Sequence, residues 1–179
     1  MIIAVAGRRI DAEDAKSARF PLKNVPLVQQ RLDELFRREA ATALVSSGAC
    51  GADLAALTVA AARHMRRRIV LPFDRAQFRA SSVTDRPGEW GPVYDQVLAE
   101  LDRTGDIVTL QGNAAGDAAY AAANQAILQE ATTLARQGRT DVLAVLVWEG
   151  APRDGADMTA AFGDEARRRG CRVEHVKTL

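Results

Sequence analysis

Short apolar segments alternate with longer segments of helical periodicity along the whole chain, and this alternation constrains the fold more than any other feature. The apolar segments cover residues 2–7, 41–48, 67–73, 105–110, 140–150 and 171–176, and the longest helical patterns cover residues 25–40, 52–65, 88–103, 116–138 and 157–170. Strands separated by helices form βαβ units with parallel pairing. Near-continuous apolar strands are typical of sheets that helices cover on both faces. The sequence therefore predicts an α/β fold: a three-layer, Rossmann-like, doubly wound, mainly parallel sheet with helices on both faces.

The length and composition are those of one folded domain without a nucleic-acid or membrane partner. The 179 residues contain no linker or repeat, so we expect a single domain over residues 1–179. Lys and Arg number 24 against 23 Asp and Glu, a net charge of +1, which argues against a nucleic-acid partner. No apolar segment approaches the ~18 residues of a membrane helix. The N-terminal apolar segment is too short for a signal peptide, and two cysteines suit a reducing compartment, so we expect a cytoplasmic protein.

The segments that follow the predicted strands carry the chemistry. In an open parallel sheet, ligands bind outside the carboxyl ends of the strands. The segments at those ends combine paired glycines, arginines and hydroxyl side chains: Gly7-Arg8-Arg9, the turn 46–51, the segment 72–83 and the segment 148–159. This convergence predicts a binding site along the edge of the sheet that the carboxyl ends of the strands form.

The turn "SSGACGAD" (residues 46–53) joins the second apolar segment to an alanine-rich helix without a bulky side chain. Gly48 and Gly51 permit backbone conformations and close approaches that a Cβ would block. The helix N-terminus that follows attracts anions, so the turn is a candidate phosphate site. A tight strand-to-helix turn without a ligand is the alternative. Asp53 in the first helical turn either stabilises the helix or contacts a ribose hydroxyl.

Several charged residues near this edge have two interpretations each. Arg8 and Arg9 follow the first strand, where a guanidinium can hold a phosphate bidentately. Asp74 of "DRAQ" is expected to cap a short helix. Glu149 after the fifth strand is the best-placed general base, with an exposed loop glutamate as the alternative. The basic run 66–68 lies at the opposite edge and is expected to be solvated near a helix C-terminus.

The segments "AGRRID", "RFP" (Arg19–Pro21), "SSGACGAD", "VLPFDRAQFRASSV" and "VLAVLVWEG" resemble the SLOG superfamily. These are Rossmann-like domains related to the Lonely Guy phosphoribohydrolases and to DNA-processing protein A. The resemblance covers nearly the whole chain and is strongest to a subgroup in bacterial signalling contexts. It implies a nucleotide pocket built by the turns around Gly7-Arg8, Ser47–Gly51, Asp74–Ser82 and Trp148–Thr159.

The sequence departs from the Lonely Guy enzymes after the fifth strand. Those enzymes carry a Pro-Gly-Gly-x-Gly-Thr-x-x-Glu motif there, and this chain reads "WEGAPRDGADMTAAFGDE" (residues 148–165). Gly155 and Thr159 preserve part of an anion-binding turn, but the contiguous glycines are absent. The catalytic glutamate of the motif has no secure counterpart.

We therefore expect binding of a nucleotide or nucleotide-derived small ligand by a sensor in bacterial signalling. The alternative is hydrolysis of an N-glycosidic bond in a nucleoside monophosphate. The catalytic candidates are Glu149 and Asp53; the ligand-binding candidates are Gly7, Arg8, Arg9, Ser47, Gly48, Ala49, Gly51, Asp74, Arg79, Ser82, Trp148, Gly155 and Thr159. We expect no cofactor and no metal, because the two histidines lie away from the ligand edge. We expect a homo-oligomer, although the alanine-rich segments 54–62 and 118–126 could equally pack on their own sheet.

Overall fold

The computed structural model describes residues 1–111 and 116–179 and contains one parallel six-stranded sheet. The strand order is β4-β3-β2-β1-β5-β6, and every pair of neighbouring strands is parallel. The strands are β1 (Ile2–Gly7), β2 (Ala43–Ser46), β3 (Arg66–Leu71), β4 (Ile107–Thr109), β5 (Val142–Trp148) and β6 (Arg172–Lys177). The predicted fold class and all six predicted strands are confirmed.

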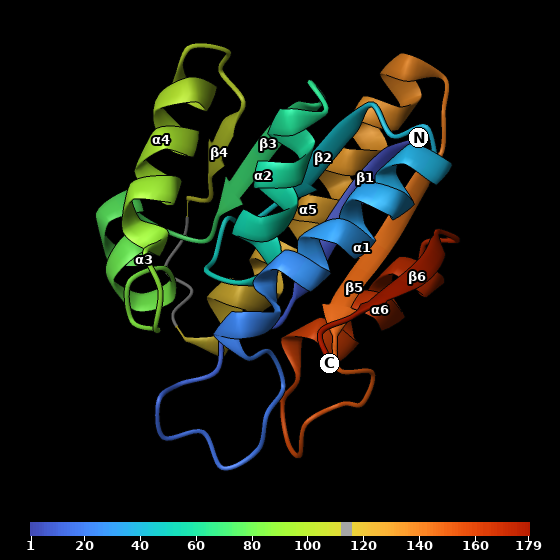
Figure 1. Ribbon diagram of the computed structural model, residues 1–179. Helices are drawn as coiled ribbons and strands as arrows, with labels where there is room; N and C mark the ends of the chain where they lie inside the picture. The colour runs from blue at the N-terminus through green and yellow to red at the C-terminus, as the bar shows by residue number, and fades with distance from the viewer. Residues whose placement is uncertain (112–115) are drawn as a thin grey trace.

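Helices cover both faces of the sheet and complete the three layers (Figure 1). The helices are α1 (Val25–Arg38), α2 (Ala52–Ala62), α3 (Arg75–Ser82), α4 (Trp90–Asp102), α5 (Asp117–Gly138) and α6 (Met158–Arg168), with a 3-10 turn at Leu22–Asn24. One core cluster joins α1, α2 and α4 to the sheet, and a second joins α5 and α6 to the opposite face. Successive side chains of a strand point to opposite faces, so Ile3 and Val5 lie in the first cluster while Ala4 lies in the second.

The alanine-rich helices pack against the sheet of their own chain. Leu54 and Leu57 of α2 are fully buried in the first core, and α2 contacts β1, β2 and β3. Ala123 and Ala131 of α5 are buried, and α5 crosses β1, β2, β3 and β5 on the other face. Small side chains let these helices approach the strands closely, which explains their composition without a second subunit. The homo-oligomer stays a prediction.

The strand β5 is the most hydrophobic, although β1 and β2 occupy the two middle places of the sheet and β5 has only β6 beyond it. Its hydrophobicity follows from helical cover on both faces, which does not require the middle position. The prediction that the basic run 66–68 is solvated is wrong in part. The run lies at the start of β3 and Arg66 is exposed, but Arg66 and Arg68 pair with the buried Asp106, and Arg67 pairs with Glu100.

The topology changes direction at β1. From β1 the chain moves outward through β2, β3 and β4, and α5 then returns it to β5 on the other side of β1. The register pairs Gly7 with Val147, so the segments after β1 and β5 leave the sheet side by side. In Figure 1 both segments project as long loops from the same end of the sheet. Such a switch point is where open α/β sheets bind ligands.

No helix within residues 1–111 and 116–179 combines the length and the hydrophobicity required to span a membrane.

Candidate functional site

A cavity of about 550 Å³ lies at the switch point. Its floor is the carboxyl end of β1 and the turn after β2, and its sides are the loop 8–19, the segment 153–159 and one face of α5. Small-molecule sites in proteins have volumes of about 300–1,000 Å³ and occur at such switch points. The size and position of the cavity suit one small ligand.

The cavity brings together about half of the residues that the sequence singled out. Eight of them line it: Gly7, Arg8, Arg9, Ser47, Ala49, Asp53, Ser82 and Thr159. The other seven do not border it: Gly48, Gly51, Asp74, Arg79, Trp148, Glu149 and Gly155. Asp74 caps α3 as expected, because its carboxylate accepts hydrogen bonds from the backbone N–H groups of Ala76 and Gln77. Arg79 pairs with the exposed Asp95.

The turn after β2 closes around the carboxyl group of Asp53. Asp53 is 5% exposed, and its Oδ2 accepts hydrogen bonds from Ser47 Oγ and from the backbone N–H of Ala49, the latter at 3.2 Å. Burial raises the pKa of Asp53 to about 6, and the hydrogen bonds from Ser47 and the turn amides offset part of that rise. The turn thus presents a carboxyl group to the cavity, in the place where a phosphate was expected.

Gly51 allows the segments after β1 and β2 to touch. The N–H of Ala52 donates to the Arg8 carbonyl oxygen at 3.1 Å, which draws the two backbones together at the start of α2. A Cβ on Gly51 would lie 2.8 Å from both the Arg8 carbonyl oxygen and the Ile10 nitrogen, and its φ is +88°. Gly51 is therefore required by a backbone-to-backbone approach rather than by a ligand.

Replacing Gly51 with Ala should lower the free energy of unfolding by about 2–4 kcal/mol, because the new Cβ meets backbone atoms that cannot move independently. Chemical denaturation measures the effect. Gly105→Ala is the matched control, since Gly105 also has a positive φ (+68°) but faces open space; it should cost roughly 1 kcal/mol. Equal losses for the two variants would contradict the close-approach explanation.

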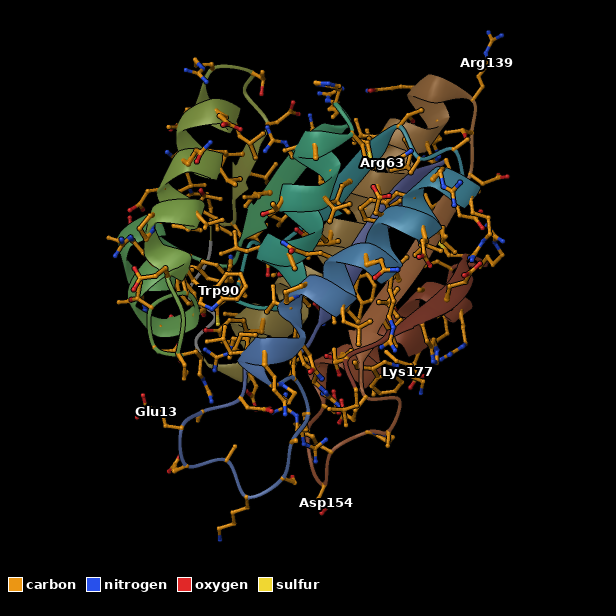
Figure 2. All side chains as sticks on the ribbon, viewed as in Figure 1. Glu13, Arg63, Trp90, Arg139, Asp154 and Lys177 are labelled. Atoms are coloured by element: carbon orange, nitrogen blue, oxygen red, sulfur yellow. The ribbon has the colours of Figure 1, made fainter. Side chains whose placement is uncertain are left out.

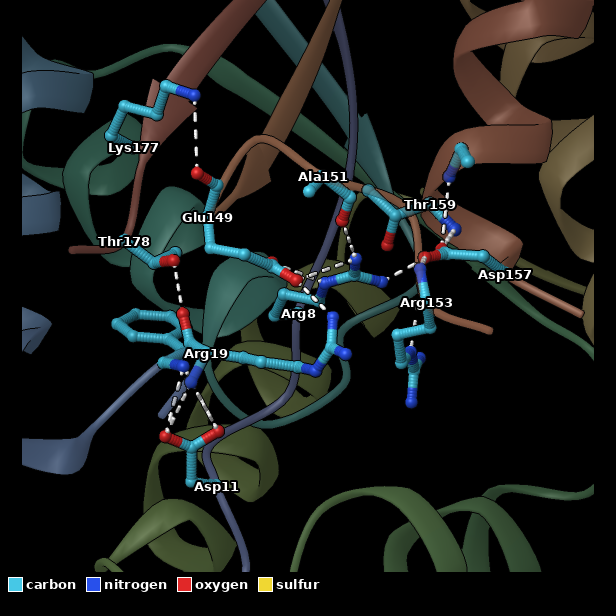
Figure 3. Close-up of polar contacts among 12 residues, drawn as sticks. Arg8, Asp11, Arg19, Glu149, Ala151, Arg153, Asp157, Thr159, Lys177 and Thr178 are labelled. Carbon is cyan, nitrogen blue, oxygen red and sulfur yellow. Dashed lines mark hydrogen bonds and ion pairs between the residues drawn. The ribbon is translucent and has the colours of Figure 1, made fainter. Parts of the chain in front are cut away.

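Arg8 is buried and holds the segment after β5 against β1 (Figure 3). Its Nε donates to Glu149 Oε2 at 2.7 Å, Nη1 to Asp157 Oδ1 at 2.8 Å, and Nη2 to Glu149 Oε1 at 3.0 Å and to the Ala151 carbonyl oxygen at 2.9 Å. The guanidinium also lies over the Trp148 ring, with Cζ 5.4 Å from the ring centroid. Arg8 thus uses most of its N–H donors in hydrogen bonds within the protein rather than for a ligand.

The carboxylates around Arg8 are held in their charged form. Burial alone would raise the pKa of Glu149, but hydrogen bonds from Arg8 and Arg19 bring it below its usual value. Burial alone would raise the pKa of Asp157 as well. The hydrogen bonds that the Asp157 carboxylate accepts from Arg8 and from backbone N–H groups hold its pKa far below the usual value. A carboxylate paired with two arginines is a poor proton acceptor near neutral pH. Glu149 is therefore placed to organise the loop rather than to act as a base.

Asp157 also occupies the N-terminus of α6. Its carboxylate accepts hydrogen bonds from the N–H groups of Thr159 at 2.9 Å and Ala160 at 3.1 Å, and from the N–H of Arg153 at 2.7 Å. Thr159 lines the cavity, but its N–H is already used by this cap. The hydrogen bond from the Arg153 N–H to Asp157 fixes the position of the Arg153 backbone beside the N-terminus of α6.

Arg153 is a cavity-lining cation that the sequence reasoning missed. Burial lowers its pKa, and the nearby positive charges of Arg8 and Arg19 lower it further. The side chain is 50% exposed, and its Nε forms an ion pair with Asp157 Oδ2 at 4.0 Å; within the described ranges its guanidinium makes no hydrogen bond. Figure 3 shows that guanidinium extending away from the Arg8 cluster. The rule of reading the segments after strands would have found it, because it follows β5 by five residues.

Other groups of the cavity wall had no comparable signal in the sequence. Tyr120 and Asn124 project from one face of α5. The Tyr120 hydroxyl lies 2.9 Å from Ser82 Oγ, and Asn124 Nδ2 donates to the Met158 carbonyl oxygen at 2.8 Å. Which face of α5 meets the cavity depends on how the helix crosses the sheet, and the sequence does not specify this. Arg86 lines the cavity too; its buried Nε makes no hydrogen bond within the described part of the chain but forms an ion pair with Asp85 Oδ2 at 3.4 Å.

Over residues 1–111 and 116–179 no cluster of three or more His, Cys, Asp or Glu side chains is arranged to hold a metal ion. The polar groups of the cavity are instead hydroxyls, an amide, the carboxyl groups of Asp11, Asp53 and Asp117, and six Arg or Lys side chains, so cations outnumber carboxyl groups. They suit an organic ligand that carries an anionic group.

Comparison with known proteins adds little to this geometry. No protein-family model matches the sequence, and no curated protein is significantly similar to it. Among solved structures, the X-ray structure of DNA processing protein A from Streptococcus pneumoniae is similar in fold, with 14% identity and a TM-score of 0.43. The alignment covers 98% of this chain and 58% of that protein, so the chain spans little more than half of its length. Similarity at this level gives no basis for transferring ligands or residue roles.

Proposed function

We propose that the chain binds a nucleotide or nucleotide-derived ligand in the switch-point cavity, and that it acts as a sensor of that ligand. The observation that carries the proposal is Arg153, which lines the cavity and whose guanidinium makes no hydrogen bond within residues 1–111 and 116–179; its ion pair with Asp157 has an Nε–Oδ2 distance of 4.0 Å. About half of the side chain is exposed, so the guanidinium is accessible to an anionic partner. A phosphate group of the ligand is the partner that suits a guanidinium best.

The interior of the cavity suits the rest of such a ligand. Ala49, Ala123 and Ile127 supply apolar wall, and the Tyr120 ring lies beside them. Ser47, Ser82 and the Asp53 carboxyl group offer hydrogen bonds to sugar hydroxyls. Specific small-molecule sites generally combine a mainly apolar wall with a few placed polar groups. Under this proposal Arg8 positions the loop that carries Arg153, and Arg153 contacts the phosphate.

Thermal unfolding in the presence of nucleoside monophosphates, cyclic nucleotides, NAD and ADP-ribose tests the proposal. A ligand at about 100 times its dissociation constant should add about 2.7 kcal/mol. For a chain of this size we expect the unfolding midpoint to rise by about 5–10 °C with one ligand class. Arg153→Gln should weaken binding of that ligand by about tenfold or more, because a charge-assisted hydrogen bond contributes about 1.5–3 kcal/mol.

Arg139→Gln is the matched control for Arg153→Gln. Arg139 is exposed at the end of α5, and Figure 2 shows it at the opposite end of the molecule from the ligand loops. Arg139→Gln should leave unchanged both the unfolding midpoint of the free protein and the rise of that midpoint with ligand. No midpoint shift with any compound, or equal affinities of wild type and Arg153→Gln, would contradict the proposal.

A second candidate function is hydrolysis of an N-glycosidic bond, and the position of Asp53 favours it. Asp53 lines the cavity, whereas Glu149 does not and is paired with Arg8 and Arg19. A group whose pKa lies near the working pH is the most effective general acid or base, and the pKa of Asp53 is raised to about 6. Asp53 rather than Glu149 is therefore the carboxyl group to test for catalysis.

Chromatography of nucleoside monophosphates incubated with the protein separates the two functions. Release of free base that Asp53→Asn abolishes and Asp154→Asn leaves intact would support hydrolysis. Asp154 is an exposed loop residue, shown at the outer end of its loop in Figure 2, and serves as the control for the same chemical change. Binding without release of base would leave the sensor as the function.

A further inference from the structure

The segment 11–20 is a loop whose two ends are fastened to each other. The N–H of Asp11 donates to the Phe20 carbonyl oxygen at 3.0 Å, and the Asp11 carboxylate accepts from the N–H groups of Arg19 and Phe20 at 3.0–3.2 Å. Ile10 and Phe20 on either side of this closure are buried in the core. A compact surface loop with its ends held together is an Ω-loop, a class that is often functional.

The middle of this loop has few attachments. Residues 13–18 are all exposed, and Figure 2 shows Glu13 projecting into solvent. Within the described part of the chain, the only hydrogen bond recorded for residues 12–18 joins the Ala15 N–H to the Ala12 carbonyl oxygen, and none of these residues is in an ion pair. Segments with few buried contacts open at low free-energy cost. Movement of residues 12–18 would therefore break few contacts.

The same loop borders the cavity next to its cationic wall. Ala15, Lys16 and Ser17 line the cavity, as does Arg153 from the segment after β5. The base of the loop is tied to that side of the site, because Arg19 pairs with Glu149 and its carbonyl oxygen accepts from Thr178 Oγ1. The loop is thus fixed at its base beside the cavity and free at its tip.

We propose that residues 12–18 form a lid that closes over an anionic ligand held by Arg153, with Lys16 pairing with the anion in the closed state. Lys16 and Arg153 both line the cavity, whereas Glu13 and Asp14, the two carboxylates of this segment, do not. An anion between the two cations pairs with both of them and stabilises closure. This inference rests on the proposed function only in that the ligand carries an anionic group.

Hydrogen exchange of the peptide covering residues 11–20 tests the lid, with AMP and inorganic pyrophosphate as the probes. In the ligand-free protein the amides of residues 12–18 should exchange much faster than those of α5. A probe at about ten times its dissociation constant should slow their exchange by about tenfold, and Arg153→Gln, with about tenfold weaker binding, should reduce this protection to about twofold at the same probe concentration. Lys16→Gln should weaken probe binding by about tenfold without changing the unfolding midpoint of the free protein. Lys23→Gln, an exposed lysine that does not line the cavity, should change neither.

The possible results separate the lid from the proposed function. A probe that raises the unfolding midpoint but leaves exchange of residues 12–18 unchanged overturns the lid and leaves ligand binding standing. Exchange of this loop as slow as that of α5 in the free protein overturns the lid whatever binds. Unchanged affinity in Lys16→Gln overturns the role of Lys16. If neither AMP nor pyrophosphate slows the exchange or shifts the unfolding midpoint, the lid is contradicted for both probes. The thermal-unfolding measurements with the other compounds then test the proposed function separately.

Discussion

Replacing Arg8 with Gln should lower the free energy of unfolding by about 3–5 kcal/mol, the usual loss when one partner of a buried ion pair is removed. Arg8 and Asp157 side chains are 3% and 2% exposed, and Glu149 is 11% exposed. The substitution leaves two carboxylates in a poorly solvated place, with Arg19 and the α6 N-terminus as their remaining partners. For a chain of this length the unfolding midpoint should fall by about 10 °C. Urea denaturation and thermal unfolding both measure the loss.

Arg75→Gln is the control for Arg8→Gln. Arg75 makes a bidentate pair with Asp102, at 2.7 Å for both contacts, but the two side chains are 44% and 49% exposed. Exposed pairs contribute at most about 1 kcal/mol, because water screens the charges and solvates each partner alone. A loss for Arg8→Gln no larger than for Arg75→Gln would show that the Arg8 network does not hold the loop.

Asp53→Asn should stabilise the protein progressively as the pH rises. The pKa of Asp53 is raised from 3.8 to about 6 by burial, so between these values the folded protein holds a proton that the unfolded chain has lost. The stability that this proton contributes is fully present below the pKa of the unfolded chain, 3.8, and is lost as the pH rises through the pKa of the folded protein, about 6. The difference in free energy of unfolding, Asp53→Asn minus wild type, should grow by about 3 kcal/mol from about pH 4 to about pH 8.

Urea denaturation of both proteins across this pH range measures the difference. Asp154→Asn, the same change at an exposed carboxylate, should show little variation with pH over that range. The paired carboxylates Glu149 and Asp157, whose pKa values are lowered, contribute equally to wild type and variant and cancel in the difference. A difference that stays constant with pH would mean that Asp53 ionises as readily in the folded protein as in the unfolded chain.

The sequence predicted where the cavity lies, because the carboxyl ends of the strands in a parallel sheet lie together. Gly7, Ser47 and Asp53 were named from this rule, and all three line the cavity. Glu149 was named from the same rule but does not line it, and its carboxylate pairs with Arg8 and Arg19 instead. Position after a strand shows where a residue is in the sheet, but not which way its side chain turns.

The sequence by itself determined the elements, their parallel pairing and the edge that carries the site, since hydrophobic periodicity and turn residues are local properties of the chain. Only the tertiary structure decided how the charges are distributed at that edge. Arg8 is held by Glu149 and Asp157 through short hydrogen bonds, whereas Arg153, on the same loop as those carboxylates, lines the cavity and lies 4.0 Å from Asp157. Pairing of buried charges depends on distances between segments about 140 residues apart, here Arg8 and Glu149. Such distances are fixed by packing and by strand register, which no local pattern encodes.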